Sequence, residues 1–245
     1  MRLTLGRIFL GVALLGFGVE NILFGRYIVA RVAPWPADGS VRFAIACITA
    51  IVFLAAGAAF LIGRGRRVAG LTIATLIMGW SIVRHLPVAI AGPAWSGDWT
   101  NVLKAGTLAA GALAVAAGDD RPMGSAVASL RRLAPYVVGA FFVLGGIQHF
   151  MFATFVATLI PPFIPWPYFW TYFAGVCLFL GGVGLWTPFI RSLAATLTGL
   201  MVFSWVFLVH VPLVFNVGRA EWMGVFEALG ISGVCLMLTS PPPPA

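Results

Sequence analysis

The chain has 245 residues, of which 61% are hydrophobic and 9% are charged, and its formal net charge is +8. A soluble domain carries about 25% charged residues, so this composition excludes an ordinary soluble protein. Several apolar runs approach the roughly 20 residues that cross a bilayer as a helix. We therefore expect an all-α, multi-pass membrane protein in contact with the lipid bilayer. Its arginines are explained as topology determinants in short loops, and no nucleic-acid partner is indicated.

The first half of the chain, residues 1–118, is predicted to form one four-helix unit. Its apolar segments cover residues 5–26, 41–62, 68–87 and 99–117. The third segment ends at Trp80-Ser-Ile-Val-Arg84-His85-Leu-Pro87, because a proline lacks the backbone donor that continues a helix. Asp98 is predicted to cap the fourth segment, where its charge suits the positive end of the helix dipole.

The second half repeats this order after a polar linker at 119–133, which we expect in the cytoplasm. Residues 134–240 form the second unit, with helices predicted at 134–155, 168–187, 192–213 and 222–239, before a proline tail at 241–245. The motif Trp205-Val-Phe-Leu-Val-His210-Val-Pro212 corresponds to the one that begins at Trp80, and Pro165-Trp166-Pro167 corresponds to Pro34-Trp35-Pro36. An acid-tryptophan pair also follows both motifs, as Asp98-Trp99 and Glu221-Trp222. The chain is thus predicted to be a tandem duplication.

The expected topology follows from the even number of spans in each unit. Two four-helix units enter from the same face, so the repeats should be parallel and related by a pseudo-two-fold axis along the membrane normal. Nine basic residues fall on the face that holds the termini and six on the other. This excess predicts both termini in the cytoplasm and the protein in the cell membrane, the inner one where a cell has two.

Polar side chains within the spans gather in the half away from the termini. We predict that they line a pocket open toward the outside, and the ligand-pocket candidates are Glu20, Asn21, Arg84, His85, Lys104, Gln148, His149, His210, Glu221 and Glu227. Ionisable residues inside membrane spans are rare, and they are functional candidates by default. The sequence assigns none of them a catalytic role.

Two pairs of charges are predicted from the repeat. Gln148 and Val209 stand in the second unit where Glu20 and Arg84 stand in the first, so both charges vanish together. Because a lone charge at membrane depth is costly, we predict an ion pair between Glu20 and Arg84.

Lys104 and Glu227 have opposite signs at corresponding positions of the fourth and eighth helices. Both helices are rich in small residues, which permits close packing. Either the two side chains pair across the axis, or each extends separately to the membrane interface.

Three interpretations of the histidines remain open. They could hydrogen-bond backbone carbonyls, such as those that Pro87 and Pro212 leave free. They could donate a hydrogen bond to the carbonyl of a quinone or similar amphiphile in the pocket. Haem or metal ligation by His149 and His210 is disfavoured, because no further ligand set has a recognisable spacing.

The second unit resembles the DoxX-like family of integral membrane proteins. The resemblance rests on Gly145-Gly-Ile-Gln-His149-Phe, Ile160-Pro-Pro-Phe-Ile-Pro165-Trp-Pro, Tyr172-Phe-Ala-Gly175 and Leu180-Gly-Gly-Val-Gly184-Leu. It covers 134–240 well and 5–117 more weakly, where Glu20-Asn21 replaces the family's glutamine- or lysine-histidine kind of pair. The resemblance implies association with membrane oxidoreductase complexes, including subunits of thiosulfate:quinone oxidoreductases.

Three functions are compatible with these features. The first is a redox-associated membrane subunit with an outer-face pocket for a quinone or lipid-like ligand. The second is a small-solute permease with Glu20, Arg84, Lys104 and Glu227 along its path, although the inner halves of the spans offer no polar lining. The third is a structural membrane partner without catalytic activity.

Overall fold

The computed structural model describes residues 2–25, 36, 38–118 and 124–239. The Pro34-Trp35 part of the first loop, the linker residues 119–123 and the proline tail lie outside the described residues. Within those described, the chain is helical and contains no strand.

The first half contains α1 (Arg2–Phe24), α2 (Gly39–Ile62), α3 (Arg66–Trp80), the π-helical turn η1 (Ser81–His85), α4 (Leu86–Ala91) and α5 (Gly97–Ala117). The second half begins with α6 (Ser125–Arg132), α7 (Ala134–Met151), α8 (Ala153–Ala157) and α9 (Pro167–Trp186). It continues with α10 (Arg191–Trp205), the π-helical turn η2 (Val206–His210), α11 (Val211–Asn216), the 3-10 turn η3 (Arg219–Glu221) and α12 (Trp222–Leu238).

Helices occupy all eight apolar segments that the sequence predicts. Seven of those described are long and apolar enough to cross a membrane by length and composition. The helix α12 is also apolar but has 17 residues, fewer than the roughly 20 that span a bilayer without tilt or thinning. The chain is therefore an all-helical protein with seven membrane-length helices among the described residues.

The third and seventh spans continue past the prolines where the sequence predicts that they end. Each passes through a π-helical turn, in which the N–H of Leu86 bonds the carbonyl of Ser81 and the N–H of Val211 bonds that of Val206. Each proline then falls in the first turn of the next helix, where its missing donor is not needed. The predicted ends at 87 and 213 were wrong for this reason.

The predicted cap of the fourth span was also wrong. Ser96 is the N-cap residue of α5, and Asp98 lies inside the first turn. An aspartate does cap α2, where Asp38 accepts a hydrogen bond from the N–H of Val41 at 2.9 Å.

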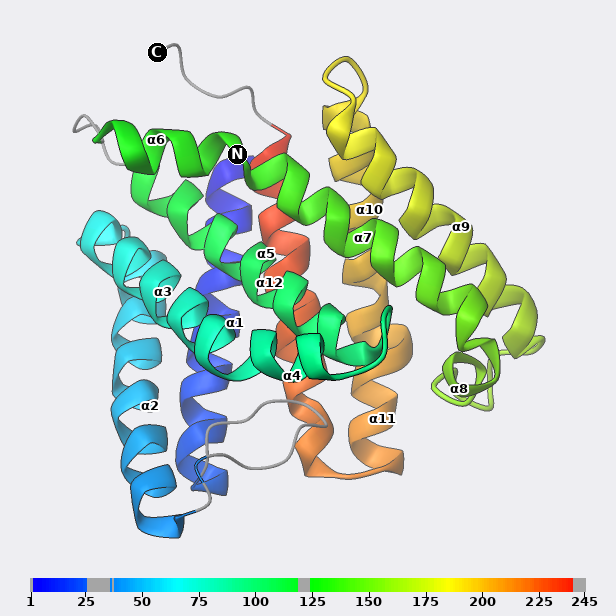
Figure 1. Cartoon of the computed structure of the whole chain (residues 1–245), viewed down its shortest axis with the longest axis horizontal. Helices are drawn as coiled ribbons and strands as arrows, with labels where there is room; N and C mark the ends of the chain where they lie inside the picture. The colour runs from blue at the N-terminus through cyan, green and yellow to red at the C-terminus, as the bar shows by residue number, and fades with distance from the viewer. Residues whose placement is uncertain (1, 26–35, 37, 119–123, 240–245) are drawn as a thin grey trace.

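The helices pack so that α1 lies against both α2 and α12, α7 lies against α9, and α3 lies against α5. Further contacts join α2 to α3, α5 to α7, α9 to α10 and α10 to α12, so that these helices form a closed ring. Within this ring, α5 and α12 also contact each other. The start of α1 and the end of α12 lie toward the same edge of the bundle as α6, while α4, α8 and α11 lie toward the other edge (Figure 1).

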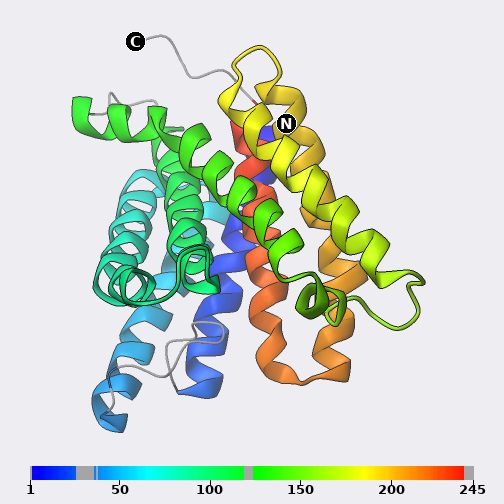
Figure 2. The same cartoon turned by 45° about the vertical axis from the view of Figure 1, so that its right-hand side comes forward.

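Glycine pairs bring the backbones of neighbouring helices close together. The helices α1 and α12 run side by side (Figure 2), and a Cβ built on Gly233 would lie 2.6 Å from the carbonyl oxygen of Gly6. On α7 and α9, a Cβ on Gly182 would lie 2.5 Å from the carbonyl oxygen of Gly139. Small residues at such crossings are the usual means of packing helices tightly in a membrane.

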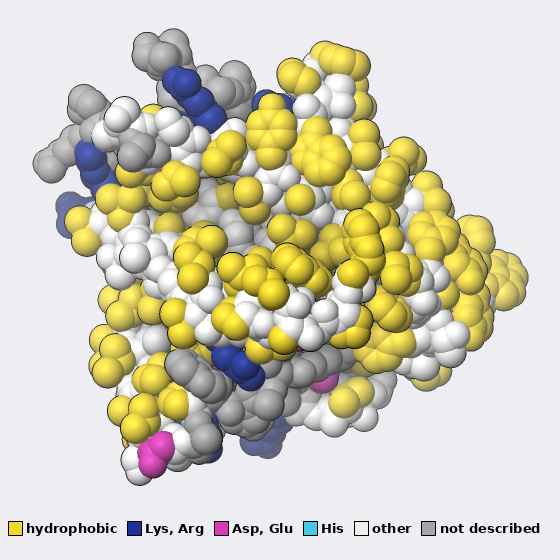
Figure 3. Space-filling view, viewed as in Figure 1, with side chains coloured by type: hydrophobic (Ala, Val, Ile, Leu, Met, Phe, Trp, Pro, Cys, Tyr) yellow, Lys and Arg dark blue, Asp and Glu magenta, His cyan; other side chains and the backbone are white. Residues whose placement is uncertain are grey.

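The visible surface is largely apolar. Hydrophobic side chains spread over the part of the bundle formed by α7 and α9, whereas the Lys and Arg side chains in this view lie outside that part (Figure 3). The exposed large side chains of α9 include Tyr168, Phe169, Trp170, Tyr172, Phe173, Phe179 and Leu180. Such a continuous apolar surface is expected for helices that contact lipid acyl chains.

Candidate functional site

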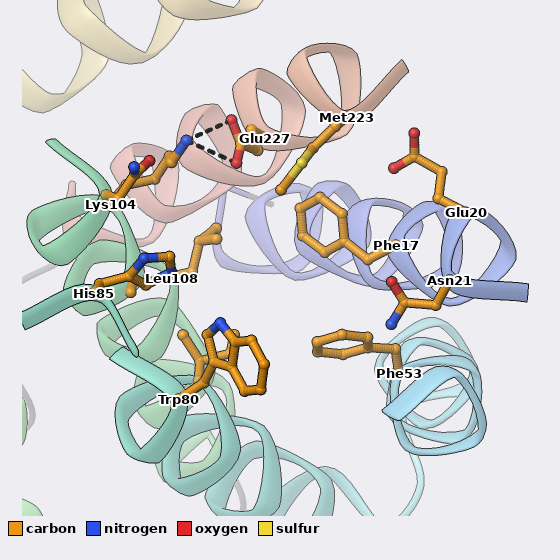
Figure 4. Close-up of a pocket in the computed structure, with 13 residues that line it drawn as sticks. Phe17, Glu20, Asn21, Phe53, Trp80, His85, Lys104, Leu108, Met223 and Glu227 are labelled. Carbon is orange, nitrogen blue, oxygen red and sulfur yellow. Dashed lines mark hydrogen bonds and ion pairs between the residues drawn. The ribbon is translucent and has the colours of Figure 1, made fainter. Parts of the chain in front are cut away.

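A partly open cavity of about 60 Å³ lies among helices of the first half and α12 (Figure 4). Most of its residues come from the end of α1, the end of α3 with η1, and the first halves of α5 and α12, and Phe53 comes from the middle of α2. They are Phe17, Glu20, Asn21, Phe53, Ile77, Trp80, His85, Asn101, Lys104, Ala105, Leu108, Met223 and Glu227.

Lys104 and Glu227 form an ion pair that joins α5 to α12. The Nζ of Lys104 lies 2.8 Å from Oε1 and donates a hydrogen bond to Oε2 at 2.8 Å. The two side chains are 15% and 13% exposed, so each charge is largely removed from solvent. The sequence left open whether these charges pair or extend separately, and pairing is the arrangement that is found.

Glu20 lines the same cavity but has no such partner. The residue is 3% exposed, and neither carboxylate oxygen takes part in a hydrogen bond. The predicted ion pair with Arg84 was therefore wrong. Successive residues of a helix face different directions, so His85 lines the cavity while Arg84, beside it in η1, does not.

The neighbouring Asn21 is buried and anchored to α2. Its Nδ2 donates a hydrogen bond to Oγ1 of Thr49 at 3.0 Å, and that hydroxyl in turn donates to the carbonyl oxygen of Ile45 at 2.7 Å. This chain of hydrogen bonds fixes the end of α1 beside the cavity, because buried polar groups are held where their partners lie.

His85 is 7% exposed and contributes its ring to the cavity (Figure 4). No hydrogen bond joins this ring to another described residue, so the bond to a carbonyl freed by proline, one of the three interpretations of the histidines, is not found for it. Lys104, Arg84 and Asp98 lie close enough to act on the ring electrostatically.

Apart from Glu227, the polar candidates of the second half lie outside the cavity. Gln148 accepts a hydrogen bond from Oγ1 of Thr100 at 2.6 Å, and its Nε2 donates to the carbonyl oxygens of Trp95 and Ser96, both at 2.9 Å. Gln148 thus fastens α7 to the turn before α5. Trp95 has a φ of 66° there, which is uncommon for a residue with a side chain.

The two histidines of the second half occupy packed positions. Nδ1 of His149 lies 2.7 Å from the carbonyl oxygen of Gly145, and the ring stacks on Trp205 with 6.3 Å between centroids. His210 lies directly against Gly224, where a Cβ would come within 2.7 Å of its Nδ1. Neither histidine lines the cavity, and neither does Glu221 in η3.

Sequence reasoning missed the apolar walls and one polar residue of the cavity. Phe17 lies one turn before Glu20 and Asn21, Asn101 lies one turn before Lys104, and Met223 one turn before Glu227. Residues three or four apart share a helix face, so this spacing was the signal that could have found them. Phe53 carries no comparable signal, because α2 is apolar throughout that region.

No group of three or more His, Cys, Asp or Glu that could hold a metal ion is found among the described residues. The three cysteines are free, and Cys235 is buried.

One family model matches the chain over residues 138–231, and it is described as a domain of unknown function (DUF8561). This match begins in α7 and ends in α12, and it does not reach the helices that provide most of the cavity. No curated protein and no solved structure matches the chain.

Proposed function

We propose that this protein is a redox-associated membrane subunit whose cavity binds the head group of a quinone or similar lipid-like molecule. The observation that carries the proposal is the buried carboxylate of Glu20, which lines a cavity without taking part in a hydrogen bond. Buried polar groups in folded proteins are almost always satisfied. A group bound in the cavity would supply the missing partner.

The size of the cavity favours a head group over a whole lipid. About 10–15 Å³ of such volume holds one water molecule, so 60 Å³ holds about four to six water-sized groups, roughly a single ring. The apolar chain of the ligand would extend out of the cavity through its open side. Phe17, Phe53 and Trp80 offer aromatic walls, and a few polar groups among apolar walls are typical of ligand sites.

The proposal includes a duplicated architecture of eight membrane helices. In this architecture the cavity lies in the outer half of the membrane. Both copies of the Trp-x4-His-x-Pro motif adopt a π-helical turn, and the first helix of each half packs on the last helix of the other. Such turns occur frequently at functional sites. The association with a redox complex is supported by the resemblance of the second half to DoxX-like proteins.

The proposal is tested by asking what the protein carries when it is purified in a mild detergent. Native mass spectrometry and solvent extraction should find a quinone or lipid-like molecule bound to the wild type. His85→Ala should reduce its occupancy, whereas His210→Ala, the same change at a histidine outside the cavity, should not. An empty wild type that also fails to bind an added short-chain quinone or hydroquinone would refute the proposal.

A further inference from the structure

We propose that the cavity selects the reduced, hydroquinone form of its head group, because Glu20 accepts a hydrogen bond from a ligand hydroxyl. This inference rests on the function proposed above and adds the chemical form of the ligand. It follows from the groups that line the cavity and from a comparison of the two halves of the chain.

Of the two carboxylic side chains that line the cavity, Glu227 is paired and Glu20 has no hydrogen bond. Lys104 is held by both oxygens of Glu227, so its charge is already matched. Glu20 then remains as a carboxylate whose two oxygens have nothing to accept. An oxidised quinone offers only acceptor oxygens, whereas a hydroquinone offers two hydroxyl donors. Hydrogen bonds to a charged group are the stronger ones, so the donor form gains more.

The second half shows how the same position is satisfied when no ligand is required. Gln148 corresponds to Glu20 in the repeat, and its Oε1 accepts a hydrogen bond from Thr100 at 2.6 Å. Counted from the acid-tryptophan pairs, Met223 occupies the position that corresponds to Thr100. Glu20 therefore has a thioether at the position where Gln148 has a hydroxyl donor. That difference leaves Glu20 open to a donor from outside the chain.

The position of His85 fits a ring with two oxygens. Figure 4 shows Glu20 and His85 on opposite sides of the cavity, with Phe17 and Trp80 between them. The hydroxyls of a hydroquinone lie at opposite ends of its ring. Glu20 would receive one hydroxyl and His85 the other, since an imidazole nitrogen can accept a hydrogen bond.

The test compares tetramethyl-hydroquinone with tetramethyl-benzoquinone, titrated calorimetrically under anaerobic conditions into the protein in detergent. We expect the wild type to bind the hydroquinone about tenfold more tightly or better, which is the lower range for a hydrogen bond to a charged group. Glu20→Gln should reduce this ratio toward one. Glu221→Gln, the same change at an acid outside the cavity, should leave it unchanged.

Met223→Thr provides a second variant that keeps the carboxylate and serves if Glu20→Gln does not fold. It gives Glu20 a hydroxyl from within the chain, as Thr100 does for Gln148, so the preference for hydroquinone should fall. Equal or tighter binding of the quinone by the wild type would overturn the inference and leave the proposed function intact. Binding of neither compound would refute the proposed function itself. Binding of dodecylamine that depends on Glu20, without binding of the hydroquinone, would also overturn the inference in favour of an ammonium ligand.

Discussion

The Nζ of Lys104 lies 2.8 Å from a carboxylate oxygen of Glu227, 123 positions further along the chain. The pair fastens the two halves together at membrane depth. Removing one partner leaves a lone buried charge, so we expect Lys104→Met to lower the free energy of unfolding by about 2–3 kcal/mol. Thermal unfolding of the purified protein in detergent measures this loss.

The double variant Lys104→Met, Glu227→Met provides the control for this pair. Apolar side chains often replace a buried ion pair at little cost, so the double variant should recover most of the lost stability. A double variant less stable than either single variant would show that the two charges do not act on each other.

A second prediction concerns the contact between α1 and α12. Gly233→Ala places a Cβ 2.6 Å from the carbonyl oxygen of Gly6, so the helices must separate. Overpacking of this kind costs about 1–3 kcal/mol, and a lower unfolding temperature should result. Gly79→Ala in α3 is the matched control, because nothing lies within 4 Å of a Cβ there. Equal effects of the two changes would contradict tight packing of α1 on α12.

A third prediction concerns Gln148. Gln148→Leu removes the donor that the carbonyl oxygens of Trp95 and Ser96 share, and we expect a loss of about 1–3 kcal/mol in unfolding free energy. Gln148→Glu should cost more, because it directs a carboxylate at two carbonyl oxygens. Chemical denaturation compares the two variants with Asn216→Leu, a change at an exposed amide that should have little effect. If the leucine variant is the less stable of the two, Gln148 does not act as the donor to this turn.

A fourth prediction concerns orientation in the membrane. The excess of basic residues on the side of the termini predicts that both ends face the cytoplasm. A fluorescent protein fused to the C-terminus should therefore fluoresce in a bacterial host, whereas an alkaline phosphatase at that site should be inactive. Alkaline phosphatase inserted at residues 158–166, in the loop between α8 and α9, should be active. The reverse pattern would invert the orientation and place the cavity on the cytoplasmic side.

The sequence predicted the positions of the helices well, because long apolar runs and proline-rich turns are local signals. Their ends were less predictable where Pro87 and Pro212 follow a π-helical turn, since the hydrogen-bond shift in such a turn leaves no mark in the composition. The pair of Lys104 with Glu227 was one of two arrangements that the sequence allowed, because the two opposite charges occupy corresponding positions of the predicted repeat.

The error at Glu20 has a different origin. The joint loss of Glu20 and Arg84 in the second half indicated a direct pair, but coincidence of charges does not define which way each side chain faces. The cavity around Glu20 also depends on α12 from the other half, which supplies Met223 and Glu227. Contacts between helices so distant in sequence depend on how their small residues pack. Hydrophobic periodicity alone does not show which helices will pack together.

The contact of α1 with α12 bears on how the protein is made. The ribosome produces α1 long before α12, so the carboxylate of Glu20 enters the bilayer without the helix that later encloses it. During this interval α1 must be sheltered by α2, by the insertion machinery or by its own protonation. The cavity is therefore completed only when α12 docks, and we expect a chain truncated before Trp222 to be a target for membrane quality control rather than a partly working protein.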